Sequence, residues 1–404
     1  MLSRISIWKK TCCFRALKPK PHRRPASPHK PLFLLMGVWA MLVPWVWVWP
    51  GLVNDPMFWH AHELIFGMAG AALGGYLLIA LPSWTGPKSR HRIGRLPLVL
   101  LVLAWGLGRG AMLAEVQGPV LLLSVSLYPL GLAVLVLPPL WHARSWQKLP
   151  LAGVPVVLAV ADLAWLVRRQ SGVSDQGFGL ALVLGFAVML SVVGGRAVPA
   201  FINSRFQGTD GCVLPHRSLG ALASGLVLLA LGGLGMGMSA LAGAAVLAAG
   251  ALQAFRGFAW FRNGVFAHLD LMLLWLAWAW LATGLMLLGG ALLLPDVMAV
   301  AMALHGLTMG AMGAMIMAVA GRAFMARAPG RLQASAVQVA GFASVGLAAT
   351  IRLVFPDTEV LGFVGLAWSV AAWSLGWALF LWPALRNLAK PAPHPVLSAS
   401  RART

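Results

Sequence analysis

Apolar stretches that approach the roughly 20 residues needed to cross a bilayer core recur throughout this chain of 404 residues. No segment between neighbouring stretches is long enough to form a soluble domain. The sequence therefore predicts an all-α, polytopic membrane helix bundle of about twelve transmembrane helices. The twelve predicted spans are residues 33–53, 61–82, 97–115, 119–140, 150–168, 178–195, 218–235, 240–257, 270–294, 297–321, 333–354 and 360–385.

Composition supports the same class. Hydrophobic residues make up 60% of the chain, charged residues only 10%, and the mean hydropathy is +0.82. A soluble domain has about 25% charged residues. We expect a basic cytoplasmic tail at 1–31, a single transmembrane domain at 32–386 and a second cytoplasmic tail at 387–404, with the lipid bilayer as the main partner.

The formal net charge of +21 is distributed unevenly along the chain. Twenty-seven of the 31 Lys and Arg residues lie in the two tails and in loops on the same predicted side, whereas the opposite loops collect six Asp and Glu residues. The positive-inside rule then places both termini in the cytoplasm. Nucleic-acid binding is not expected, because no aromatic-interleaved nucleic-acid fold accompanies the charge.

Residues 59–63 read Trp-His-Ala-His-Glu at the start of the second span. Ionisable groups at that depth are costly and usually functional. Asp55 is expected to cap the helix and Pro56 to occupy its first position. At 3.6 residues per turn His62 lies about 200° from His60, so one histidine can bind a cofactor while the other makes a structural hydrogen bond. Metal or haem ligation and interfacial capping both remain open.

The tenth span carries a second polar pattern. A row of thioethers around one imidazole suits Cu(I) or haem iron, but methionine is also a common core filler. His305 in mid-membrane favours the metal, since an unpaired imidazole there is costly. The row consists of Met298, Met302, His305, Met309 and Met312, at spacings that predict one helix face.

Three charged residues are expected toward the same ends of their spans. Glu63, Arg109 and Asp162 lie in the second, third and fifth spans, where they could meet. A structural ion pair between Arg109 and one of the carboxylates is one interpretation. A proton or ion relay is the other.

Several of these segments resemble the NnrS family. The resemblance rests on residues 59–63 followed by Phe66 and Gly67, on Leu-Leu-Ile-Ala at 77–80, on Pro-Ser-Trp-Thr-Gly at 82–86, on Gly-Gly-Arg-Ala-Val-Pro at 194–199 and on His-Gly-Leu-Thr-Met-Gly-Ala-Met-Gly at 305–313, with Met315 and Arg322. It covers nearly the whole chain after residue 31, and the first of these motifs is the most specific.

The resemblance implies a twelve-helix bacterial inner-membrane protein that contains haem and copper and acts in the response to nitric oxide and nitrosative stress. It makes His60, His62 and His305 the expected cofactor ligands, with Met309 as a further metal ligand. Three further residues would then contact the ligands without binding the metal themselves: Glu63, Arg109 and Asp162.

The ninth span departs from the family pattern. Where relatives commonly have His-Leu-Gly-Tyr-Ala-Trp, residues 275–280 read Trp-Leu-Ala-Trp-Ala-Trp. The indole N–H of Trp275 cannot ligate a metal, so the haem or copper complement is expected to be reduced or altered. His268, two turns earlier on roughly the same face, is the alternative ligand.

Two functions from different classes follow. The first is a haem and copper protein that binds or detoxifies nitric oxide at a metal site among the helices. The second is a metal-free transporter or sensor in which Glu63, Arg109 and Asp162 form a proton relay. The sequence does not decide whether the protein turns over a substrate, nor which redox partner it has.

Overall fold

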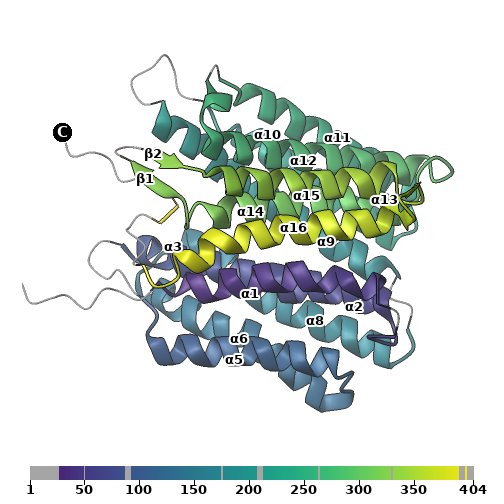
Figure 1. Cartoon of the computed structure of the whole chain (residues 1–404), viewed down its shortest axis with the longest axis horizontal. Coiled ribbons are helices and arrows are strands. Elements are labelled where there is room, and N and C mark those ends of the chain that lie inside the picture. Colours follow the sequence, from purple (N-terminus) through teal and green to yellow (C-terminus); the bar gives the residue numbers. More distant parts are fainter. Residues whose placement is uncertain are drawn as a thin grey trace, which may run out of the picture.

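The fold is described by a computed structural model for residues 27–49, 51–86, 92–173, 176–206, 213–262, 264–328, 331–390 and 396–397. Its helices run side by side along the long axis of the molecule (Figure 1). Within these residues, twelve helical spans are long and apolar enough to cross a membrane. The predicted all-α, multi-pass bundle is therefore confirmed.

Several spans consist of more than one helical element. In chain order the spans are α1 (His29–Leu42) with the 3-10 helix η1 (Val43–Trp47); α2 (Pro56–His62) with the π-helix η2 (Glu63–Ala69) and α3 (Gly70–Trp84); α5 (Arg95–Leu113); α6 (Gly118–His142); η3 (Trp146–Lys148) with α7 (Leu149–Ala152) and α8 (Val154–Gln170); α9 (Gln176–Arg205); α10 (Arg217–Gly235); α11 (Ser239–Ala259); α12 (Leu269–Leu293); α13 (Val300–His305) with the π-helix η5 (Gly306–Gly313) and α14 (Ala314–Gly321); α15 (Ala336–Val354); and α16 (Gly365–Arg386).

The remaining elements are short. A 3-10 turn, η4 (Val265–Ala267), precedes α12. Strand β1 (Ala326–Ala328) pairs antiparallel with β2 (Arg331–Gln333), and β3 (Glu359–Val360) pairs antiparallel with β4 (Phe363–Val364).

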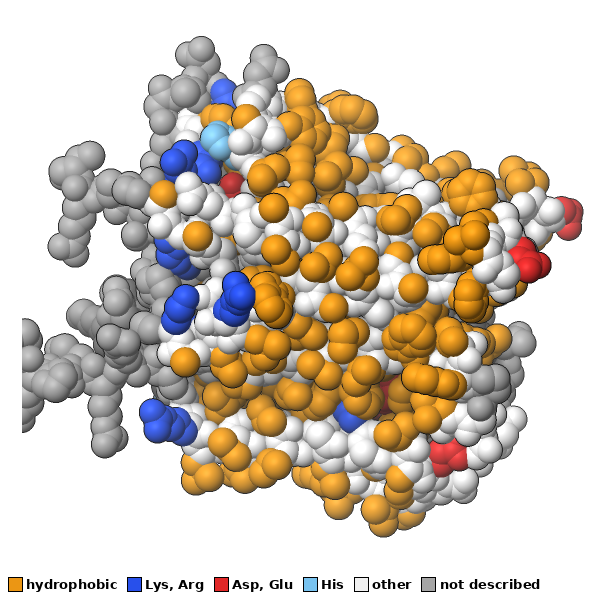
Figure 2. Space-filling model, viewed as in Figure 1, with side chains coloured by type: hydrophobic (Ala, Val, Ile, Leu, Met, Phe, Trp, Pro, Cys, Tyr) orange, Lys and Arg blue, Asp and Glu red, His pale blue; other side chains and the backbone are white. Residues whose placement is uncertain are grey.

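The two ends of the bundle differ in charge. We call the end that carries the loops after α3, α6, α9, α11 and α14 the basic end, and the opposite end, which carries Asp55, Glu115, Asp296, Asp357 and Glu359, the acidic end. Figure 2 shows Lys and Arg side chains at the first end, Asp and Glu at the second, and a mostly apolar surface between them. This distribution is the one that the positive-inside rule interprets as topology.

All twelve predicted spans overlap an observed one, but some limits were wrong. The first span covers His29–Trp47 rather than 33–53, and a break at Gly51, whose φ of +83° is left-handed, separates it from α2. The last span begins at Gly365 rather than at 360, because residues 359–364 form the β3–β4 hairpin. Apolarity alone did not distinguish these connections from the helices beside them.

Two spans are interrupted by π-helices at similar depth. In one, η2 follows His62 directly, and in the other, η5 follows His305 directly. The α2 and α13 segments that precede them both lie toward the acidic end (Figure 1). Segments of π-helix are rare and occur frequently at functional sites. Both sequence-predicted histidine positions thus adjoin an irregular part of the backbone.

Close backbone contacts hold the helices around these segments. A Cβ atom at Gly289 of α12 would lie 2.5 Å from the Leu247 nitrogen of α11. A Cβ at Gly284, further along α12, would lie 2.7 Å from the carbonyl carbon of Gly306. Small residues allow such approach where lipid provides no hydrophobic drive to association. The second contact fixes the level of η5, and hence of His305, against α12.

The predicted tails are only partly described. Residues 1–26 lie outside the described residues, and α1 begins at His29, before the predicted boundary at 31. The Lys30 ammonium donates to the carbonyl oxygens of Asn387 and Lys390. Arg322 Nε donates to the carbonyl oxygen of Leu397 at 2.7 Å. Parts of the predicted C-terminal tail therefore pack against the basic end of the bundle.

Candidate functional site

The site starts from the cap of α2. Asp55 Oδ1 accepts a hydrogen bond from the Phe58 backbone N–H at 3.0 Å, and Pro56 occupies the first helical position. The predicted helix start is therefore confirmed. It places His60 and His62 in the first two turns, on opposite sides of a short helix.

His62 points into the bundle and is fully buried. Its Nδ1 lies 3.0 Å from Glu63 Oε1, and its Nε2 lies 2.8 Å from Asp162 Oδ1 on α8. Ionised carboxylates only accept hydrogen bonds, so both ring nitrogens carry hydrogens in this arrangement. Neither nitrogen then has a lone pair free for a metal. This geometry matches the alternative in which one histidine of the pair makes structural hydrogen bonds.

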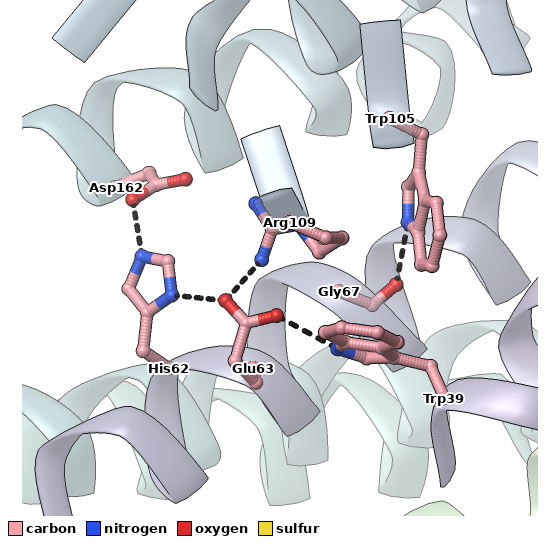
Figure 3. A network of polar contacts seen from close by, with 7 residues as sticks. All are labelled: Trp39, His62, Glu63, Gly67, Trp105, Arg109 and Asp162. Atoms are coloured by element: carbon pink, nitrogen blue, oxygen red, sulfur yellow. Dashed lines mark hydrogen bonds and ion pairs between the residues drawn. The ribbon is translucent and has the colours of Figure 1, made fainter. Parts of the chain in front are cut away.

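Glu63 connects His62 to two further helices (Figure 3). Its Oε1 accepts from Arg109 Nη1 of α5 at 2.6 Å, and its Oε2 accepts from Trp39 Nε1 of α1 at 2.7 Å. The three charged groups expected to meet do so, with His62 between the carboxylates. Two negative and two positive groups balance one another, as buried charges require.

A water-sized space adjoins these groups. Arg109 and Asp162 line a cavity of about 20 Å³, together with Tyr128, whose hydroxyl donates to the Gly70 carbonyl oxygen at 3.0 Å. This volume is near that of one water molecule. Among the described residues, the Arg109 Nε has no hydrogen-bond partner. We infer that one water molecule fits beside the buried charges.

His60 lies on the other side of α2, in different surroundings. Its ring packs edge-on against Trp47, with ring centroids 5.6 Å apart. His305 and Arg352 lie near enough to His60 to act on it electrostatically. Its Nδ1 is buried, and that atom has no hydrogen-bond partner among the described residues. The prediction that His60 and His62 lie on different sides of the helix is thus confirmed.

His305 ends α13 and offers one nitrogen. Its Nδ1–H donates to the Ala301 carbonyl oxygen at 2.9 Å, which leaves the Nε2 lone pair free. A backbone carbonyl that receives the other ring N–H is the usual support of a metal-binding histidine. His60 and His305 are 245 residues apart in the chain, yet in the fold His305 lies near enough to His60 to act on it electrostatically.

The predicted methionine row does not form one helix face. Met298 precedes α13, Met302 lies within it, and Met309 and Met312 lie in the π-helix η5. A π-helix takes more residues per turn than an α-helix, so the α-helical spacing of three and four no longer aligns these side chains. Met312 is buried in the core, whereas Met309 is half-buried.

Trp275 lies at another level of the bundle. It is in the second turn of α12 from the basic end, and its Nε1 donates to the Gly257 carbonyl oxygen at 2.9 Å. Gly284 packs on Gly306, directly after His305. Nine residues separate Trp275 from Gly284, about 14 Å along the helix axis. A ligand at 275, or at the still earlier His268, would not share a metal with His305.

The described residues contain no group of three or more His, Cys, Asp or Glu side chains that could hold a metal ion. Haem iron, however, needs only one or two protein ligands, and copper also accepts thioethers. His60 and His305 each have a ring nitrogen of the kind that such a centre uses.

A larger cavity of about 530 Å³ lies at the acidic end, near Asp55 and Glu115. Its lining includes four residues that lie one helical turn from His62, Glu63, Arg109 and Asp162 respectively. These four are Phe58, Trp59, Met112 and Leu166. The cavity therefore comes within one turn of the buried charges, on the side away from the basic end.

Three functional neighbours were missed by sequence analysis. Trp39 and Trp47 belong to an apolar span in which tryptophans carry no special signal, and Arg352 reads as an ordinary residue near a span end. Only the packing of α1, η1 and α15 against α2 and α13 makes them part of the site. Nothing in their spacing could have indicated this.

Comparison with known proteins identifies a family. Residues 25–391 match the family model described as NnrS protein. No curated protein and no solved structure matches the chain. The match includes every residue of the site described above.

Proposed function

Because the chain belongs to the NnrS family, and is thus a multi-pass membrane protein of the nitric oxide response, we propose that it binds nitric oxide at a haem or copper centre among its helices. The proposal places this protein in the bacterial inner membrane with its basic end and both termini in the cytoplasm.

One observation carries the proposal. Among the described residues, the buried Nδ1 of His60 has no hydrogen-bond partner, and the Nε2 of the nearby His305 has none either, while the His305 Nδ1–H donates to Ala301. An unpaired polar nitrogen inside a membrane protein is costly. Coordination of a metal would satisfy both imidazoles at once.

His60 and His305 would hold the metal, and Met309 in η5 is the thioether proposed beside them. When bound, haem iron or copper supplies an open coordination position at which nitric oxide can bind. His62 has a different proposed role. Its bonds to Glu63 and Asp162 fix the rotation of α2 and thereby direct His60 toward α13.

The location suits the proposed ligand. Nitric oxide is small and apolar, so it partitions into lipid and needs no aqueous channel to reach a site between helices. Trp47 covers one side of His60 with an apolar ring. A neutral gas passes such a barrier more easily than an ion does.

The test is an optical spectrum and a metal analysis of the protein after haem- and copper-replete expression. A Soret band or stoichiometric copper supports the proposal. His60→Ala and His305→Ala should each lower the bound cofactor severalfold. His142→Ala, which alters an exposed histidine at the basic end, is the matched control and should leave cofactor content unchanged.

A different result would favour the other function. If the folded protein takes up neither haem nor copper, or if both histidine variants keep full cofactor content, the metal proposal fails. A metal-free transporter or sensor would then be preferred, in which Glu63, Arg109 and Asp162 relay a proton.

A further inference from the structure

The cavity of about 530 Å³ at the acidic end has no role in the proposed function. Its lining includes none of the proposed metal ligands His60, His305 and Met309. The wall comes from α2, α5, α6 and α8 and from the loops beside them, so the packing of four spans fixes its shape. Pockets that hold small organic molecules have volumes of about 300–1,000 Å³. The cavity is therefore large enough for such a molecule.

The buried part of the wall, which we call the floor, is apolar. Each of the four helices contributes one buried side chain to it, namely Trp59, Met112, Leu121 and Leu166. Trp59 is only 6% exposed, and its Nε1 has no hydrogen-bond partner among the described residues. A buried donor without a partner is uncommon in a native protein and indicates a water molecule or ligand atom nearby.

The exposed part of the wall, which we call the rim, is polar. It carries the side chains of Asn54, Glu115, Gln117 and Gln170. These residues lie before α2, between α5 and α6, and at the end of α8. A polar rim above an apolar floor suits an amphipathic molecule, because its polar group can stay near water while its apolar part is buried.

The charges that line the cavity do not balance. Arg169 forms an ion pair with Asp55, and its guanidinium carbon lies 4.1 Å from the centroid of the Phe58 ring. Glu115 instead accepts hydrogen bonds from Asn54, whose backbone N–H lies 2.6 Å from Oε1 and whose Nδ2 donates to Oε2. Among the described residues, no Lys, Arg or His nitrogen lies within salt-bridge distance of Glu115. One negative charge is therefore in excess, which attracts a cation.

Glu115 also keeps room for a further donor. A carboxylate offers about four acceptor positions, and Asn54 occupies two of them. A metal ion at Glu115 would leave the apolar floor without a partner, and a neutral apolar molecule would leave the charge of Glu115 without one. An ammonium group attached to an apolar body satisfies both parts of the wall.

We propose that this cavity binds an amphipathic organic cation, whose ammonium group pairs with Glu115 at the rim and whose apolar body covers the floor. This binding is a second function of the protein. It does not depend on haem, copper or nitric oxide, because the proposed metal ligands lie outside the lining.

The test uses three probes with the same apolar body and different charge: phenylbutylamine, phenylbutanol and phenylbutyrate. Each is titrated by calorimetry into full-length protein in nanodiscs of zwitterionic lipid, and empty nanodiscs measure partition into the lipid alone. The amine should bind most tightly and the carboxylate least. Methylammonium, which has the charge without the body, should show no saturable binding. High salt should reduce the difference between amine and alcohol.

Two variants test the rim. Glu115→Gln removes the charge but keeps an acceptor for Asn54, and it should weaken binding of the amine about fivefold, since an ion pair at an exposed rim contributes modestly. Gln170→Lys adds a cation at the exposed end of α8 and should weaken the amine by a similar factor. Neither variant should change binding of the alcohol. Glu359→Gln, which neutralises an exposed acid of β3 at the same end, is the matched control and should bind the amine like the wild type.

Three results would overturn the proposal. The first is amine binding to the protein no greater than to empty nanodiscs. The second is equal affinity for the amine and the alcohol in the wild type. The third is unchanged amine affinity in a folded Glu115→Gln or Gln170→Lys protein. Because all titrations use protein without haem or copper, a failure of the proposed metal centre would not affect them.

Discussion

His62 Nε2 and Asp162 Oδ1 lie 2.8 Å apart and join α2 to α8 inside the bundle. With Glu63 and Arg109 they form a set of four buried groups whose charges cancel. Removal of one partner from such a set leaves an uncompensated charge, which is far more costly than the net value of the intact pair. The set therefore makes the orientation of α2 sensitive to single substitutions.

Asp162→Ala should strongly destabilise the protein. Loss of the carboxylate leaves His62 and Arg109 with one acid between them, and a change of this kind costs about 3–5 kcal/mol. Asp162→Asn should cost less, because its amide oxygen still accepts from His62. Thermal unfolding in detergent, followed by tryptophan fluorescence, measures both. Asp296→Asn, at an exposed position of the acidic end, is the control, and equal midpoints for Asp162→Ala and this control would contradict the expectation.

Gly284→Ala should displace η5. The added Cβ would lie 2.7 Å from the carbonyl carbon of Gly306, a backbone atom that cannot move without its helix. Overpacking of this kind costs about 1–3 kcal/mol, and the shift would move His305, so cofactor content should also fall. Gly290→Ala on the same helix meets no atom within 4 Å and should change neither property. A normal cofactor level in stable Gly284→Ala protein would show that the level of η5 does not control His305.

The spans were predictable because they depend on apolar length alone. Each predicted stretch overlaps an observed span. The π-helices η2 and η5 were not predictable, since they depend on how neighbouring helices pack. As a result, the α-helical periodicity assigned to Met309 and Met312 was wrong.

The site was predictable only where local geometry sufficed. Asp55 and Pro56 indicated the start of α2, and helical spacing separated His60 from His62. The pairing of His62 with Asp162 joins residues 100 positions apart in the chain. The contact of Arg352 with Met302 likewise depends on how α15 packs against α13, which no spacing within either segment reveals.

The cap at Asp55 gives a pH dependence. Burial raises the pKa of Asp55, but the hydrogen bonds from Phe58 and Arg169 outweigh burial and hold that pKa below its ordinary 3.8. A lowered folded-state pKa means that the stabilisation is present above about pH 3.8 and is lost as the pH falls through the folded-state value.

Asp55→Ala should therefore lower the stability by about 1 kcal/mol at neutral pH, the usual value of a helix cap. The difference from wild type should shrink once the pH falls below about 3.8. Paired unfolding curves at pH 7 and at pH 3 measure both quantities. A difference that is the same at the two pH values would mean that the carboxylate charge does not contribute to the cap.

The two ends of the bundle should face opposite compartments. A reporter fused after Lys148, at the basic end, should report cytoplasm, and one fused after Asp296, at the acidic end, should report periplasm, because basic loops are retained inside. Enzymatic reporters that are active on only one side of the membrane make the measurement. If both fusions report the same side, the proposed sidedness of the spans from the fifth to the ninth is wrong.

Trp275→His tests whether the family's histidine in the ninth span is a ligand. Imidazole offers a lone pair where indole has only a donor, so this variant should bind more haem or copper than the wild type. Replacement of Trp275 also removes its contacts with Phe261 and Phe266, and the resulting cavity costs on the order of a few kcal/mol. Folding must therefore be measured together with metal content.

The position of Trp275 allows a new metal centre there to be distinguished from one at His305. Because it lies about 14 Å along α12 from the level of His305, a centre gained at 275 should be separate and should persist when Trp275→His is combined with His305→Ala. Burial and the neighbouring Arg205 lower the pKa of His268, which keeps that imidazole neutral and able to ligate at pH 7. If Trp275→His folds but gains nothing while His268→Ala loses cofactor, the ligand has moved to His268. If neither variant changes the metal content, the ninth span has no coordinating role, and the centre at His60 and His305 must account for all bound cofactor.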